Sequence, residues 1–308
     1  MSDSVRILMG TYNGAAFLPE QLASLTAQTH KDWQLLCSDD GSTDGSQDLI
    51  RSYSANKTQK ISVVDGPKRG FSENFLSMIR ALPDDCGSIA FCDQDDIWFP
   101  DKLARAINAL RPVPADKPAL YGAASWIWNK DKETHKASLK IRHAPSFRNA
   151  LIENFATGNT MVLNQSAALL LRDAARQVGP VFAHDWLAYA VISGAGGQII
   201  YDDAPALLYR QHPSNEIGAG ETFLKRQLRN LSVADGRYKT KVGQTIEALR
   251  AVEAILTPTN RKTLYRFMQA RNTGNAVKRT WRIARSGVFR QSYRDMAGFY
   301  AAALLNKV

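Results

Sequence analysis

The first 110 residues alternate four times between a short apolar run and a longer segment whose apolar residues have helical spacing. Each apolar run is expected to be a strand, and a polar loop joins it to the helix that follows. Because this rhythm is typical of strand–helix–strand units, it predicts an α/β fold with a parallel sheet and helices on both faces. The predicted strands are residues 5–9, 34–37, 61–64 and 88–92, and the predicted helices are residues 16–28, 44–53 and 72–82, with a fourth from Pro100.

The loops after the predicted strands carry the polar residues of this half of the chain. They are residues 10–14, 38–44, 66–70 and 93–96. In parallel sheets, ligands bind beyond the carboxyl ends of the strands, where such loops gather. These loops contain neither the Gly-x-Gly-x-x-Gly pattern nor a Walker A pattern, so the standard dinucleotide and P-loop sites lack support.

A nucleotide can instead be held by aromatic stacking and by carboxylates. Tyr12 is placed to pack against a base, and Asp39 or Asp40 is placed to accept the imide N–H of uracil or thymine. Both features also have a simpler interpretation. Tyr12 is then a half-buried core ring, and the second loop is a turn in which Ser42 or Thr43 caps the next helix.

Three carboxylates lie within four positions at the end of the fourth predicted strand, at Asp93, Asp95 and Asp96. Asp93 and Asp95 are two positions apart, so in extended backbone they face the same side. Such neighbours repel each other unless a cation lies between them, and they suit a hard divalent ion, Mg²⁺ or Mn²⁺, that also holds a diphosphate. The alternative is a polar turn in which Asp96 or Asp101 caps the next helix.

Two candidate residues follow in the second part of the chain. Asp185 stands at the start of a helix, where it is either a capping residue or a rigidly held general base. His212 either completes a metal site begun by Asp95 or is an ordinary histidine. The elements predicted here are strands at residues 119–128, 198–201 and 206–209, a polar, mobile loop at 130–142, a turn and strand at 157–163, and helices at 165–177 and 186–192.

The positive charge is concentrated near the end of the chain. The net charge is +10, but residues 221–308 hold 18 Lys and Arg against 5 Asp and Glu, a net charge of +13, which leaves −3 for residues 1–220. A basic segment of this kind suggests an anionic surface as its partner. Its aromatic residues alternate with arginines, so its helices either lie on a membrane interface or pack on the rest of the protein.

Composition also bears on location. No apolar run reaches the length of a membrane span, and the first residues lack the pattern of a signal peptide. The three cysteines, Cys37, Cys86 and Cys92, have no metal-type spacing and are expected to be reduced core thiols. We therefore expect a cytoplasmic protein, with a peripheral position at the inner face of the cytoplasmic membrane as a further hypothesis.

Five motifs together resemble family 2 glycosyltransferases of the GT-A fold, and two of them, Cys92 to Trp98 and His184 to Trp186, look most like the rhamnosyltransferase branch. The motifs are Gly10-Thr11-Tyr12-Asn13-Gly14, Ser38-Asp39-Asp40-Gly41-Ser42-Thr43-Asp44, Asp93-Gln94-Asp95-Asp96-Ile97-Trp98, His184-Asp185-Trp186 and Tyr209-Arg210-Gln211-His212. The resemblance implies a mixed, mostly parallel sheet flanked by helices in residues 1–220. It further implies a nucleotide-sugar half at about 1–110 and an acceptor half at about 111–220. The basic helical region at 221–308 lies outside the resemblance.

The resemblance implies inverting transfer of a sugar from a nucleotide diphosphate sugar to a hydroxyl group. dTDP-rhamnose is the first expectation for the donor, with UDP-sugars next, and the acceptor is a cell-surface glycan or a lipid-linked glycan. Carried over to this chain, the resemblance implies that the nucleotide is bound by Thr11, Tyr12, Asn13 and Asp40, with further donor contacts from Arg69 and Asn74. It implies that Asp93 contacts the ribose or the metal, that Asp95 binds the metal, and that His212 is a third metal or diphosphate contact. Asp185 would be the general base.

Two rival functions use the same features. A sugar-phosphate nucleotidyltransferase shares the paired carboxylates, but it normally has a Gly-rich, basic loop after the first strand, where this chain has Thr11, Tyr12 and Asn13. A non-enzymatic module that binds anionic polymers would use the basic segment alone, and its binding would fall steeply with salt. We expect no nucleic acid partner.

Overall fold

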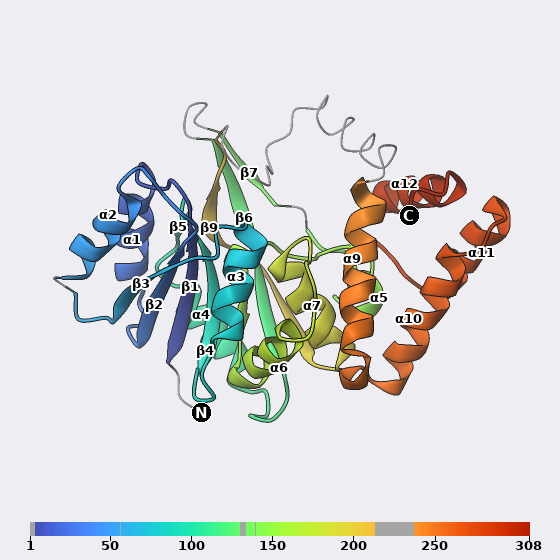
Figure 1. Ribbon diagram of the computed structural model, residues 1–308, viewed down its shortest axis with the longest axis horizontal. Helices are drawn as coiled ribbons and strands as arrows, with labels where there is room; N and C mark the ends of the chain where they lie inside the picture. Colours follow the sequence, from blue (N-terminus) through green and yellow to red (C-terminus); the bar gives the residue numbers. More distant parts are fainter. Residues whose placement is uncertain (1–3, 56, 130–133, 139, 213–236) are drawn as a thin grey trace. The chain divides into compact units, whose positions relative to one another are not determined.

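The computed structural model describes the chain except residues 1–3, 56, 130–133, 139 and 213–236 (Figure 1). The chain divides into two compact units. The first unit comprises Met1–Lys140, Ala156–Arg176 and Gly197–Ala219, and the second comprises Ile141–Phe155, Gln177–Gly196 and Gly220–Val308. The division into domains near residue 220 stays a prediction.

The first unit is built on one sheet, in which the described strands follow the order β3-β2-β1-β4-β8-β6-β9-β5, with β7 beside β6. The strands are β1 (Val5–Thr11), β2 (Trp33–Asp39), β3 (Ile61–Asp65), β4 (Ser88–Asp93), β5 (Ile97–Trp98), β6 (Ala119–Asn129), β7 (Thr134–Ala137), β8 (Val162–Leu163) and β9 (Gln198–Arg210). The pairs β1–β2, β1–β4, β2–β3 and β6–β9 are parallel, whereas β7, β8 and β5 pair antiparallel to their neighbours. The predicted mixed, mostly parallel sheet is thus confirmed.

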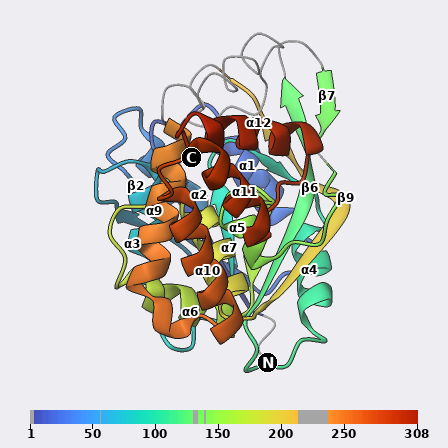
Figure 2. The ribbon, with the colours of Figure 1, turned by 90° about the vertical axis from the view of Figure 1, so that its right-hand side faces the viewer.

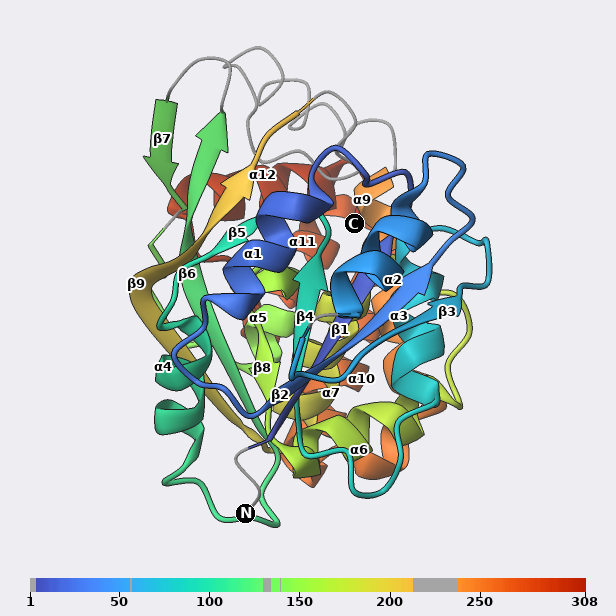
Figure 3. The same ribbon diagram turned by 90° about the vertical axis from the view of Figure 1, so that its left-hand side faces the viewer.

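Helices cover both faces of this sheet, as the alternating pattern predicts. They are α1 (Leu18–Thr26), α2 (Ser46–Ser54), α3 (Phe71–Arg80), α4 (Lys102–Leu110) and α6 (Gln165–Ala175). Figure 3 shows α1 and α2 in front of the sheet. Helices α1, α2 and α4 share one core with the sheet, while α3 and α6 contact each other and the strands β1 and β4.

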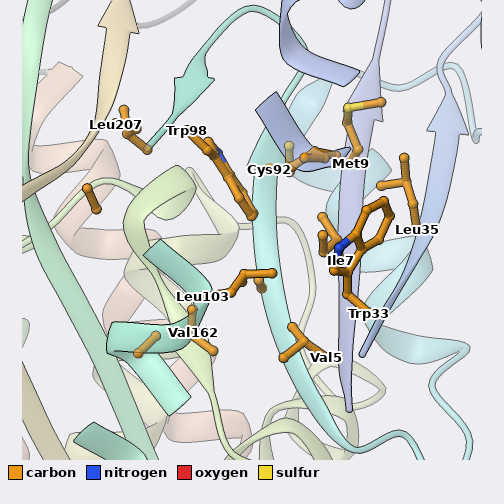
Figure 4. Close-up of a cluster of buried hydrophobic side chains, with 14 of the residues drawn as sticks. Val5, Ile7, Met9, Trp33, Leu35, Cys92, Trp98, Leu103, Val162 and Leu207 are labelled. Carbon is orange, nitrogen blue, oxygen red and sulfur yellow. The ribbon is translucent and has the colours of Figure 1, made fainter. Parts of the chain in front are cut away.

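The side chains of β1 explain why its sequence is a continuous apolar run. Val5, Ile7 and Met9 belong to the core that α1, α2 and α4 also line (Figure 4). Leu8 points to the other face, where it pairs in register with Phe91, whose ring lies 5.9 Å from that of Phe75 on α3. Successive residues of a strand face opposite sides, so a strand buried on both faces has no polar alternation.

Two predictions for the second half of the sheet are wrong in detail. The strands expected at residues 198–201 and 206–209 are the single strand β9, because shifts in its register against β6 absorb the irregularity around Pro205. Part of the polar loop expected at residues 130–142 forms β7, which pairs with β6. Residues 130–133 and 139 of that loop lie outside the described residues.

The expected cap of α2 is also wrong. Neither Ser42 nor Thr43 caps this helix, because the N-cap residue is Gly45, with φ of 86°. Glycine adopts this left-handed conformation without steric cost, and the backbone N–H of Ser46 bonds instead to the Asp44 carboxylate at 3.1 Å. The side chain of Ser42 is therefore available to the neighbouring loop.

The second unit is helical in its described residues. Its elements are α5 (Phe147–Ala150), α7 (His184–Gly194), α9 (Arg237–Ala251), a 3-10 helix (Glu253–Ile255), α10 (Pro258–Arg271), α11 (Ala276–Ser286) and α12 (Tyr293–Leu304). Helix α7 packs on α5 and α9, and α11 packs on α10 and α12 (Figure 2). Among the described helices, none combines the length and the apolar character needed to cross a bilayer.

Helix α7 is the buried element of this unit. A Cβ atom at Gly194 would lie 2.6 Å from Leu256, so the helix end requires a glycine there. The indole N–H of Trp186 donates to the carbonyl oxygen of Ala150 at 2.7 Å, which ties α7 to α5. Asp185 is the one residue of α7 that is not buried.

Candidate active site

Hydrogen bonds join the loops that follow β1 and β2. The backbone N–H of Asp40 donates to the carbonyl oxygen of Thr11 at 2.8 Å. The backbone N–H of Asn13 donates to the Ser42 hydroxyl at 2.8 Å, and the Asn13 side chain accepts from the N–H of Thr43 at 2.9 Å. The predicted nucleotide loops therefore form one connected structure at the carboxyl edge of the sheet.

Tyr12 lies exposed on this structure, with 56% of its surface accessible, so the interpretation as a core ring is wrong. Its backbone is fixed by Gln94, whose amide accepts from the N–H of Tyr12 at 2.9 Å and donates to its carbonyl oxygen at 3.0 Å. Gly14 leaves room for this contact, since a Cβ there would lie 2.2 Å from the Gln94 amide oxygen. The sequence offered no signal for this role of Gln94, because the two residues are far apart along the chain.

The two neighbouring carboxylates of the second loop have different surroundings. Asp39 is 1% exposed, and it accepts from the backbone N–H groups of Gly41 and Ser42, the hydroxyl of Ser42 and the amide of Gln47. Burial alone would raise the pKa of the Asp39 carboxyl, but these hydrogen bonds outweigh burial and lower the pKa below its usual value. Asp39 is therefore a structural anion that shapes its own loop.

Asp40 is partly exposed and connects to the third loop. One of its oxygens accepts from the backbone N–H groups of Lys68 and Arg69 at 2.6 and 3.3 Å, and the other accepts from Gly70 at 2.7 Å. Arg69 is exposed beside it. Asn74 is 2% exposed and its amide bonds to Ser38 in both directions, so it braces the end of β2.

The acidic residues after β4 form a cluster with the end of β9. The imidazole Nε2 of His212 lies 2.8 Å from a carboxylate oxygen of Asp95, and both side chains are largely buried. Asp96 is fully buried and accepts from the Asn159 amide. Its pKa is raised well above the usual value, first by burial and then by the negative charges of Asp93 and Asp95. The structure thus brings together Asp95 and His212, which lie 117 positions apart.

The capping interpretation of this loop is wrong. The carboxylate of Asp96 bonds to Asn159 and to the backbone N–H of Arg210, not to the start of α4. Asp101 occupies the N-cap position of α4, but its side chain makes no capping hydrogen bond. The carboxylates at the end of β4 are therefore not accounted for by local turn chemistry.

Lys102 was not a predicted site residue. It is fully buried, and its ammonium nitrogen lies 3.1 Å from the centre of the Trp98 ring. Burial lowers the pKa of Lys102 to about 7, while electrostatic interactions with Cys92, Asp96 and Asp93 act in the opposite direction. In its protonated form this amino group offsets part of the repulsion between Asp93 and Asp96.

Arg210 holds the other side of the cluster. It is 4% exposed, and its guanidinium donates to the carbonyl oxygen of Asp95 at 2.8 Å and to the carboxylate of Glu20. The same group lies 4.6 Å from the centre of the Trp128 ring. Because the ring of Phe17 stacks on His212 at 4.3 Å, the imidazole is also held in place. These contacts join α1, β6 and β9 to the acidic loop.

In the second unit, Asp185 lies in the first turn of α7, which begins at His184 with Ala183 as its N-cap residue. Its carboxylate accepts from the backbone N–H of Trp186 at 2.7 Å. Burial lowers the pKa of the neighbouring His184 to about 3, which keeps that imidazole neutral. The convergence of Asp185 with the acidic cluster stays a prediction.

The model of the family described as glycosyl transferase family 2 matches residues 6–179, which include the loops after β1, β2, β3 and β4. The chain belongs to glycosyltransferase family 2. This confirms the family suggested by the sequence motifs.

A curated relative supports the same family and covers more of the chain. The dTDP-rhamnosyl transferase RfbG of Shigella flexneri is 26% identical over 248 residues, which are 78% of this chain and 84% of RfbG. This family 2 glycosyltransferase is therefore similar to RfbG over most of the length of both chains.

Solved structures of other glycosyltransferases share the fold. TarS of S. aureus, residues 1–349 in complex with UDP-GlcNAc, has a TM-score of 0.53 at 14% identity, covering 95% of this chain and 92% of that one. The mannosyltransferase PcManGT of Pyrobaculum calidifontis, in complex with GDP-Man and Mn²⁺, has a TM-score of 0.50 at 16% identity, covering 98% and 86%. The predicted GT-A fold is confirmed by these likenesses.

We predict that Asp39→Asn destabilises this glycosyltransferase by about 1–3 kcal/mol at pH 7, because a buried set of donors loses its anion. The pKa of Asp39 is lowered in the folded protein, so its contribution is complete above about pH 4 and is lost as the pH falls through the lowered folded value. The free energy of unfolding, measured by urea titration from pH 7 to pH 3, should therefore show a gap between the two proteins that narrows below about pH 4.

Asp116→Asn is the matched control, because Asp116 is exposed and its substitution should leave the pH profile unchanged. A gap between Asp39→Asn and the natural protein that stays constant down to pH 3 would contradict the role assigned to Asp39.

Proposed function

We propose that this protein is an inverting glycosyltransferase that transfers L-rhamnose from dTDP-rhamnose to a hydroxyl of a cell-surface or lipid-linked glycan. The observation that carries the proposal is the contact between Asp95 and His212 beside Asp93, at the carboxyl end of β4. In parallel sheets this edge is where ligands bind. The similarity to the dTDP-rhamnosyl transferase RfbG supports the choice of donor.

Hydrogen-bond counting favours Asp40 over Asp39 as the acceptor for a pyrimidine. An ionised carboxylate offers about four acceptor positions. Asp39 is buried and already accepts four hydrogen bonds, whereas Asp40 is partly exposed and accepts three, all from the loop at residues 68–70. One acceptor position on Asp40 is left for the imide N–H of thymine or uracil.

The rest of the nucleotide pocket follows from the same loops. The exposed ring of Tyr12 can pack against the base, and Thr11 and Asn13 hold its loop next to Asp40. We assign the exposed side chain of Arg69 a contact with the donor phosphates. Asn74 is buried against Ser38, so we assign it the role of bracing this pocket.

The acidic cluster suits a divalent ion, Mg²⁺ or Mn²⁺. Burial first, and then the negative charges of Asp93 and Asp95, raise the pKa of Asp96, and a cation bound to Asp93 and Asp95 would relieve the repulsion. His212 is the third candidate ligand. In the described residues, no group of three acidic, histidine or cysteine side chains is already arranged as a metal site. When bound, the ion would neutralise charge on the departing diphosphate.

Asp185 is the proposed general base. It is the residue of α7 that remains accessible, and its backbone is held by a helix that is otherwise buried. A carboxylate fixed in this way can take the proton of the acceptor hydroxyl as its oxygen attacks the anomeric carbon from the face opposite the leaving diphosphate. Attack from that face inverts the configuration of the sugar.

The basic C-terminal region suggests where in the cell the protein binds its acceptor. We propose that the protein acts in the cytoplasm at the inner face of the membrane, with the basic residues beyond 220 facing an anionic surface that carries the acceptor.

The donor is tested by a product assay with a panel of activated sugars, including dTDP-rhamnose, UDP-sugars and GDP-mannose. Membrane extract from the source organism provides the acceptor, and the release of nucleoside diphosphate and the anomeric configuration of the product are measured. We predict that dTDP-rhamnose is turned over at least tenfold faster than the other donors and that the configuration is inverted. A faster reaction with another sugar, or retention of configuration, would contradict the proposal.

Asp185→Asn is expected to lower kcat by at least about 100-fold, because general-base assistance contributes about 10²–10⁴-fold. Its affinity for the donor nucleotide should stay near that of the natural protein, since the nucleotide loops belong to other elements. Asp295→Asn alters a carboxylate in the first turn of another helix, α12, and is expected to keep full activity. Normal turnover by Asp185→Asn would exclude Asp185 as the base.

A further inference from the structure

We propose that one face of α11 is the surface by which this protein docks on an anionic lipid bilayer. The docking face comprises Val277, Lys278, Trp281, Arg282 and Arg285. The inference rests on the membrane partner in the proposed function and assigns that partner a specific site. It concerns the second unit alone, and it can be tested without sugar transfer.

The burial pattern of α11 separates two sides of the helix. Arg279, Ile283 and Ser286, spaced by four and three residues, are buried on the inner side. Val277 and Trp281 are four residues apart on the opposite side, where they are 72% and 55% exposed. Large apolar side chains thus point outward at the centre of the outer side, where contact with water alone would not favour them.

Positive charge flanks this apolar centre. Lys278, Arg282 and Arg285 are exposed, and α11 contains no acidic residue. The guanidinium of Arg285 lies 4.7 Å from the centre of the Trp281 ring, and Arg282 uses one of its N–H groups on the Thr273 hydroxyl. The remaining N–H groups of these arginines can meet phosphate oxygens.

The docking face is held rigidly. Arg279 is 4% exposed and donates to the carbonyl oxygens of Ala303 and Leu304, which fixes α11 against the end of α12. The Asn275 side chain caps the first turn, and Gly287 ends the helix in the left-handed conformation with φ of 79°. The arrangement of apolar and basic side chains is therefore present before any partner binds.

The chemistry of this face favours a lipid surface over other partners. Tryptophan has an apolar ring and a polar N–H, and it is enriched where membranes meet water. Basic residues beside it are attracted to the negative charge of anionic lipids. A second copy of this chain would bring the same positive face, and like charges repel, so self-association through α11 is disfavoured.

The test uses the full chain and flotation with vesicles of phosphatidylcholine alone or with 30% phosphatidylglycerol. We predict that the natural protein floats with the anionic vesicles and not with the neutral ones. The double variant Arg282→Glu with Arg285→Glu should bind anionic vesicles at least about 25-fold more weakly, since each basic residue contributes about fivefold. Trp281→Ala should also weaken binding, because it removes the apolar contact without changing the charge.

The double variant Lys60→Glu with Lys117→Glu is the matched control. It makes the same change in net charge at exposed lysines of the first unit, and it is expected to float like the natural protein. Equal loss of binding in this control, or natural binding by the α11 variants, would overturn the proposal. Flotation with neutral vesicles, no flotation at all, or binding to an acidic protein or nucleic acid in place of vesicles would also overturn it.

A separate readout distinguishes this proposal from the proposed function. The α11 variants should keep their affinity for nucleoside diphosphate, because the nucleotide loops lie in the first unit. If the enzyme transfers no sugar but still floats through α11, the proposed function fails and the docking face stands. If it transfers sugar but its flotation does not depend on α11, the docking face fails alone.

Discussion

Repulsion among the carboxylates that follow β4 is the constraint on which the candidate site depends. Asp93, Asp95 and Asp96 lie within four positions, and Asp96 is fully buried, with a pKa raised first by burial and then by its two neighbours. The buried amino group of Lys102 interacts with Asp93 and Asp96, and the guanidinium of Arg210 donates to the carbonyl oxygen of Asp95. Burying like charges together lowers the stability of the folded protein. A bound cation and diphosphate that complete the cluster would explain why the fold keeps it.

A second group of anions organises the nucleotide loops by a different means. Asp39 is stabilised by neutral donors of its own loop, whereas Asp40 gathers backbone N–H groups from the loop at residues 68–70. Both carboxylates thus order loops that lack the Gly-rich patterns of the standard dinucleotide and P-loop sites. Both anions lie at the carboxyl edge of the sheet, and Tyr12 is exposed in the loop whose Thr11 carbonyl oxygen accepts from the N–H of Asp40.

The sequence predicted those features that depend on local pattern. The strands β1 and β4 have apolar runs because both of their faces are buried, and the polar loops follow where the strands end. Contacts between distant segments could not be predicted from the sequence. Gln94 and Arg210 act through partners that only the fold brings close, and Asp95 meets His212 across 117 positions. The strand β7 was missed because its sequence, Thr134–Ala137, has no apolar alternation and its order comes from pairing with β6.

We infer above all that Asp95 helps to hold a divalent ion together with the donor diphosphate. Titration calorimetry of nucleoside diphosphate, with and without Mn²⁺, tests it in the natural protein, in Asp95→Ala and in Asp101→Ala, which removes a nearby carboxylate outside the cluster. The account predicts that Mn²⁺ strengthens binding at least tenfold in the natural protein and in Asp101→Ala, and that this gain disappears in Asp95→Ala. An equal gain from Mn²⁺ in all three proteins would contradict it.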